Sequence, residues 1–83
     1  MIEYRIVSEE EGERRATFSN NLRYTLRVKG ISRDALAKKL GVSLTTAKNY
    51  VLGRTFPEEY RIEAIADILG CSVEDLFDED FEP

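Results

Sequence analysis

The sequence predicts a single all-α domain of five helices. Apolar residues recur every three or four positions through residues 17–77, as on one face of a helix, and glycines divide this region into segments of helical length. The chain has 83 residues, of which 42% are hydrophobic and 34% charged, as expected for one small globular domain. No apolar run approaches the roughly 20 residues of a membrane span, and no signal-peptide core follows Met1. We therefore expect a cytoplasmic protein.

The first two predicted helices each begin at a hydroxyl side chain and end at a glycine. Thr17 can cap a helix that Gly30 ends, and its apolar residues recur every fourth position: Phe18, Leu22 and Leu26. Ser32 can cap a second helix over residues 33–40, which ends before Gly41. The side chains expected to face inward from this second helix are Leu36, Ala37 and Leu40.

The third and fourth predicted helices follow the same pattern. Ser43 can cap a helix over residues 44–52, and Gly53 ends it. Thr55 and Glu58 have the spacing of a capping box for the next helix. The inward residues of that fourth helix are predicted to be Ile62, Ile65, Ala66 and Leu69.

The two ends of the chain are expected to differ from the helical middle. Residues 1–16 are predicted to be an N-terminal arm or linker. Within it, the alternation of residues 2–7 indicates a short strand, and residues 8–16 a polar linker or frayed helix. Ser72 can cap a short fifth helix that carries Val73, Leu76 and Phe77. Residues 78–83 form an acidic tail.

Charge is strongly segregated along the chain. The formal net charge is −4, but residues 17–56 contain eight basic residues against a single acid, Asp34, a local net charge of +7. Residues 57–83 contain ten acids against Arg61 alone, and residues 1–16 contain five acids against three arginines. Because the local field decides where a polyanion docks, the basic middle favours nucleic-acid binding despite the acidic total.

The composition argues against an enzyme. The chain has no histidine, which removes the commonest general base and most zinc sites. Cys71 is the single cysteine, so the chain contains no internal disulfide and no Cys-His nucleophile pair. We therefore expect no catalytic residue, no metal site and no cofactor.

Residues 32–53 have helix-turn-helix spacing, with a short helix, a three-residue turn that begins at Gly41, and a second short helix. Val42 is expected to fill the corner between the helices. At 100° per residue, one face of the second motif helix, residues 44–52, carries the residues expected to pack inward: Thr46, Ala47 and Tyr50. The opposite face, which could enter a DNA major groove, carries Leu44, Thr45, Lys48, Asn49 and Leu52.

This arrangement resembles the Cro/phage-repressor helix-turn-helix family, often called XRE-like. The matching stretches are "FSNNLRYTLRVKGIS", "LAKKLGVSLTTAKNYVLGR", Pro57 after Gly53, and "IEAIADILGCSVEDLF". The resemblance covers residues 17–77 and implies a compact five-helix, lambda-repressor-like DNA-binding domain. It also implies a sequence-specific transcriptional regulator that reads double-stranded DNA, with an inverted repeat bound by a homodimer.

The resemblance assigns roles to individual positions. Base-contacting positions correspond to Leu44, Thr45, Lys48 and Asn49, and phosphate-contacting positions to Arg33, Thr46 and Arg54. Asn49 suits adenine, Lys48 suits guanine or phosphate, and Leu44 could contact a thymine methyl group. The dimer contact is expected from residues 2–7 or from the fifth helix, through Leu76 and Phe77.

Three apolar residues of the second motif helix depart from the polar side chains expected there: Leu44, Val51 and Leu52. They could flank a thymine-rich site, be partly buried by the first helix or the arm, or bind a protein. The alternative hypothesis is therefore a protein-binding module on the same fold, such as an antirepressor, an antitoxin or a complex subunit. Its partner would dock through Val51 and Leu52.

Overall fold

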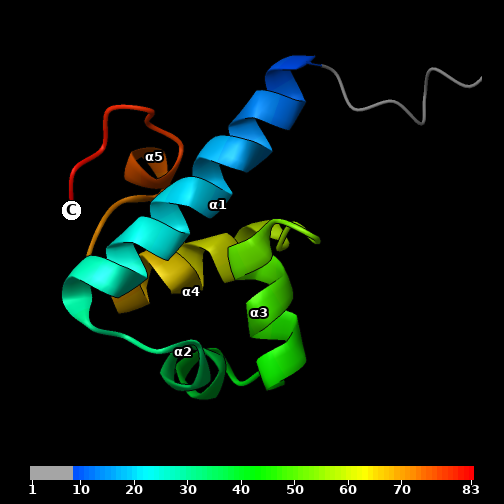
Figure 1. Ribbon diagram of the computed structural model, residues 1–83, viewed down its shortest axis with the longest axis vertical. Coiled ribbons are helices and arrows are strands. Elements are labelled where there is room, and N and C mark those ends of the chain that lie inside the picture. Colours follow the sequence, from blue (N-terminus) through cyan, green and yellow to red (C-terminus); the bar gives the residue numbers. More distant parts are fainter. Residues whose placement is uncertain (1–8) are drawn as a thin grey trace, which may run out of the picture.

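Five helices enclose one hydrophobic core in the computed structural model, which describes residues 9–83 (Figure 1). They are α1 (Glu9–Lys29), α2 (Arg33–Leu40), α3 (Leu44–Leu52), α4 (Glu59–Leu69) and α5 (Val73–Leu76). The long α1 runs between α5 on one side and α3 on the other, and α4 contacts α1, α2 and α5. The prediction of an all-α domain is thus confirmed for the described residues.

The predicted serine caps form as expected. The side chains of Ser32, Ser43 and Ser72 each accept a hydrogen bond from the backbone N–H three residues further on. At the end of α2, Gly41 adopts a φ of 74°, and Val42 N–H donates to the carbonyl of Ala37 at 3.0 Å. The left-handed backbone conformation favours glycine, which has no Cβ, and it forms the short corner between the two helices of the motif.

The start of α1 differs from the prediction. The helix begins at Glu9, so Thr17 is not its N-cap, and residues 9–16 are part of α1, which is the helical one of the two alternatives and not a separate linker. Gly12 disfavours this helix by about 1 kcal/mol relative to alanine, and contacts of a neighbouring side chain partly offset this cost. Arg15 pairs with Glu11 at 2.9 Å and lies over the ring of Phe56. The predicted strand over residues 2–7 lies outside the described residues.

The predicted capping box before α4 is also wrong. The helix begins at Glu59, with Glu58 as its N-cap residue and no side-chain hydrogen bond at that cap. Thr55 lies three residues before this cap and so cannot reach the first free N–H groups of the helix. Pro57, which is buried, directly precedes the cap and fixes the extended entry of the chain instead.

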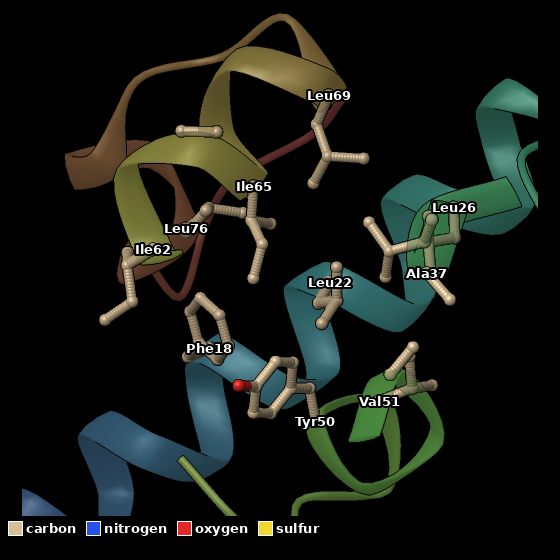
Figure 2. Close-up of a cluster of buried hydrophobic side chains, with 13 residues drawn as sticks. Phe18, Leu22, Leu26, Ala37, Tyr50, Val51, Ile62, Ile65, Leu69 and Leu76 are labelled. Atoms are coloured by element: carbon tan, nitrogen blue, oxygen red, sulfur yellow. The ribbon is translucent and has the colours of Figure 1, made fainter. Parts of the chain in front are cut away.

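Side chains of α1 lie at the centre of the core, between those of α4 and α3 (Figure 2). Phe18 packs against two further rings, Phe56 and Phe77, with centroid distances of 5.4 Å to each. All four residues predicted to face inward from α4 are buried, as are Leu36 and Ala37 of α2, while Leu40 is half-buried. Helical periodicity thus identified most of the core.

The last helix contributes to the core through Leu76. Leu76 is fully buried, and Phe77 stacks on Phe18 beneath the guanidinium of Arg14, 4.0 Å from the ring centre. Asn21 donates hydrogen bonds to the carbonyls that end this helix, at 3.0 Å to Leu76. The expectation that Leu76 supplies a dimer surface is therefore wrong, whereas Phe77 is half-buried and its part in a dimer contact stays a prediction.

Candidate nucleic-acid interface

The motif consists of α2, the turn over residues 41–43, and α3. Ala37 of α2 and Ala47 of α3 are both buried, and their small side chains let the two helices pack closely. Val42 is half-buried against the core, as predicted for the corner residue. The motif therefore presents α3 on a rigid support.

The buried face of α3 consists of Ala47, Tyr50 and Val51. Val51 is only 1% exposed, so the hypothesis that it contacts a protein partner is wrong. Of the three alternatives for this residue, burial by the first helix is the one found, because α1 as well as α2 packs on α3. Thr46, expected to face inward, is only half-buried.

The four predicted base-contacting residues lie on the remaining part of α3. Thr45 and Lys48 are exposed, Leu44 is 40% exposed, and Asn49 is half-buried. Within the part of the chain that the structure describes, the side-chain amide of Asn49 and the ammonium of Lys48 make no hydrogen bond or ion pair. These polar groups are free to meet an external ligand.

The three predicted phosphate-contacting residues lie at the edges of this surface. Arg33 is the first residue of α2, and Arg54 follows the end of α3. Both side chains are exposed and neither guanidinium has a partner among residues 9–83. The hydroxyl of Thr46 accepts a hydrogen bond from Ser43 at 3.0 Å, so Thr46 supports the helix cap and retains its own proton for a ligand.

The C-terminal end of α3 is held by α1, which the sequence does not indicate. Ser19 Oγ donates to the carbonyl of Val51 at 2.9 Å, and the guanidinium of Arg23 donates to the same carbonyl at 3.2 Å. These bonds satisfy a backbone acceptor in the last turn of α3, which has few partners within the helix. The contacts join residues 28 and 32 positions apart, so no local sequence pattern could reveal them.

A second tether joins α3 to α4. Arg61 donates a hydrogen bond to the hydroxyl of Tyr50 at 2.9 Å. This bond raises the pKa of the Arg61 guanidinium above its ordinary value, although partial desolvation opposes the effect. The last two turns of α3 are thus fixed from two sides.

Leu52 is 43% exposed and lies on the edge of an open groove between α3 and α1. The groove encloses about 400 Å³ and is lined by Gly12, Arg15, Ala16, Ser19, Asn20, Arg23, Leu52 and Gly53. Leu52 is therefore separated from the buried Val51 and remains an unexplained exposed residue.

Comparison with known families matches residues 24–76 to a helix-turn-helix family. The match covers the last part of α1 and all of α2 to α5. The search of curated proteins and the search of solved structures gave no match. Among residues 9–83, no helix is long and apolar enough to cross a membrane.

Proposed function

The chain belongs to the helix-turn-helix family of the Cro and phage-repressor (XRE) type, and from this premise we propose that it is a sequence-specific, repressor-type transcriptional regulator. The family is one of DNA-binding regulatory domains and is not typically enzymatic. The observation that carries the finer proposal is the outer face of α3, where Thr45, Lys48 and Asn49 are unpaired beside a rigidly packed inner face.

In the proposed complex, α3 enters the major groove. The amide of Asn49 pairs with an adenine edge, and Lys48 reaches guanine or a phosphate. Thr45 contacts a base edge, and Leu44 packs on a thymine methyl group. Each good bidentate pair contributes about 1–3 kcal/mol of discrimination against the wrong base.

The proposed phosphate contacts frame this helix. Arg33 and Arg54 each offer a planar fork of donors that suits a phosphate. Thr46 adds a neutral donor near the first turn of α3. These contacts set the register of the protein on the duplex and carry no sequence information of their own.

We further propose that the protein acts as a homodimer in the cytoplasm and binds an inverted repeat. Two copies related by a two-fold axis would place their α3 helices about 34 Å apart, one turn of DNA. The surface that joins the copies does not include Leu76, which is fully buried, and the half-buried Phe77 and residues 2–7 remain the candidates.

Selection of bound duplexes from a random pool tests this proposal. We expect a palindromic consensus whose affinity falls steeply as salt rises. Asn49→Ala should relax the preference at one position of each half-site, whereas Arg54→Ala should weaken all duplexes about equally. Failure to enrich any duplex at low salt would refute the proposal.

The alternative hypothesis is a protein-binding module. Because Val51 is buried, this hypothesis depends on Leu52 alone. Its support is the exposed leucine beside a groove that a partner side chain could enter. In this alternative, Leu52→Ser abolishes partner capture while Lys48→Ala leaves it intact. Loss of DNA binding in Lys48→Ala but not in Leu52→Ser would favour the transcriptional regulator.

A further inference from the structure

A second open groove, between α1 and the start of α2, is bordered by three arginines. It encloses about 390 Å³, and the buried or half-buried side chains of Leu26, Ile31 and Val51 contribute to its lining. The remaining lining residues are Arg23, Arg27, Ser32 and Arg33. We call this site the arginine groove; two of its arginines belong to α1 and lie outside the helix-turn-helix motif.

The arginines of this chain are used in two different ways. Arg14, Arg15 and Arg61 each lie over an aromatic ring of the same chain. In contrast, Arg27 and Arg33 are exposed and have no hydrogen bond, ion pair or ring contact within residues 9–83. Two of the three positive charges in the arginine groove thus have no partner in the described part of the chain.

The third arginine of the groove has a mixed role. Arg23 donates to the carbonyl of Val51 at 3.2 Å and to Oδ1 of Asn20 at 2.7 Å. Both acceptors are neutral, so the positive charge of Arg23 is not compensated by a carboxylate. Arg23 therefore positions α3 while it adds to the field of the groove.

We infer that the arginine groove binds phosphates of the DNA backbone, so that α1 extends the contact made by α2 and α3. The inference rests on the proposed function, because Arg33 opens α2 and is itself a proposed phosphate contact. Guanidinium groups bind phosphate oxygens in a bidentate manner, and a duplex supplies a closely spaced series of such anions. Among residues 9–83, the groove lining contains no acidic side chain that would repel the strand.

An acidic peptide could also meet these charges, but the duplex accounts for more of the structure. The arginine groove and the outer face of α3 belong to one rigidly packed unit, since Val51 of α3 contributes to the groove lining. A duplex seated on α3 has a phosphate strand on each side of its major groove. A single duplex that reaches both sites would thus explain the positive groove and the unpaired face of α3 together, which is part of what we infer.

The test compares Arg27→Gln with Lys29→Gln in the full chain. Both changes remove one positive charge from the last turn of α1. Lys29 lies instead near the end of α4, with its Nζ 3.7 Å from a Cβ placed on Gly70. Affinity is measured against salt concentration for the selected duplex and for an unrelated duplex, with thermal unfolding of each variant as a folding check.

We expect Arg27→Gln to reduce the slope of log affinity against log salt by about 0.9, the value for one phosphate contact. Between 50 and 200 mM salt, the loss of affinity should then be about 3.5-fold smaller than in the parent protein. Both duplexes should be weakened to a similar extent, and Lys29→Gln should retain the parent slope.

Three results would overturn the inference. If Arg27→Gln behaves like Lys29→Gln while the parent protein binds its selected duplex, the arginine groove does not hold DNA although the proposed function stands. If the parent protein binds no duplex at low salt, the proposed function and the inference both fail. If Arg27→Gln weakens binding of a poly-glutamate probe but not of duplex, the groove serves an acidic peptide.

Discussion

Replacing Gly53 by alanine tests how firmly α1 fixes the end of the proposed recognition helix. Gly53 ends α3 with a φ of 77°, in the left-handed region. A Cβ at this position would lie 3.1 Å from Oγ of Ser19. That hydroxyl is the donor to the carbonyl of Val51 at 2.9 Å. The new methyl group would therefore crowd the hydroxyl that donates this hydrogen bond.

The expected destabilisation has two parts. The left-handed conformation costs an alanine about 1 kcal/mol relative to glycine. Displacing Ser19 removes a buried hydrogen bond, which contributes a further ~1 kcal/mol. The total of about 2 kcal/mol is a large share of the roughly 4–12 kcal/mol expected for a domain of this length. It corresponds to a decrease in Tm of about 8–16 °C.

Gly41→Ala is the matched control. Gly41 has a φ of 74° and also ends a helix of the motif, but a Cβ there would have no neighbour within 4 Å. This variant should lose only the conformational part, about 1 kcal/mol. Urea unfolding followed by circular dichroism measures both free energies on the same scale.

The double variant Ser19→Ala/Gly53→Ala gives an independent check. Without the hydroxyl the close contact disappears, because Cβ of Ser19 would lie 3.5 Å away, an ordinary distance. The double variant should therefore be less destabilised than the sum of the two single variants. Equal destabilisation of Gly53→Ala and Gly41→Ala, together with strict additivity, would refute the role given to Ser19.

Three further predictions concern other contacts of the core. Thr25→Val should raise the free energy of unfolding in urea by about 1 kcal/mol, since Thr25 is fully buried and its hydroxyl has no partner in the described part of the chain; a decrease would contradict this. Asn21→Ala should lower that free energy by about 1–3 kcal/mol and speed amide exchange in α5, because Asn21 donates to the carbonyl of Asp78 at 2.9 Å; unchanged exchange would argue against this tether. Burial, and secondarily the charge of Asp75, raises the pKa of the Cys71 thiol. The protonated thiol therefore contributes to stability below the unfolded pKa of about 8.5. This contribution is lost as the pH rises through the folded pKa. Cys71→Ala should flatten this alkaline decrease in a pH series, and an unchanged profile would exclude the thiol as its source.

Features of the fold that depend on neighbouring residues could be predicted from the sequence. Each serine cap acts on a backbone N–H only three residues away, and the terminating glycines act on the turn that they end. Periodicity identified the buried residues of α2 and α4 for the same reason, since each helix turns one face to the core. These local rules also located the motif over residues 32–53.

Two features that the sequence left undecided or that were wrongly predicted have a different physical origin, namely contacts between distant parts of the chain. Whether residues 9–16 are helical depends partly on stacking between Arg14 and Phe77, which are 63 positions apart. Val51 is buried because α1 covers α3, an alternative that periodicity alone left open. Periodicity within one helix gives the angle between its side chains but not the number of helices that pack around it.

The outer residues of α3 nevertheless separate into two regions once Val51 is assigned to the core. Leu44 and Leu52 are eight positions apart, or about 12 Å along a helix axis. Leu44 lies in the first turn beside Thr45 and Lys48, so a thymine methyl contact is compatible with the proposed polar contacts. Leu52 lies in the last turn, on the groove shared with α1. DNA reading by the first turns and a protein contact at the last turn would use different atoms, so Lys48→Ala and Leu52→Ser test the two alternatives separately.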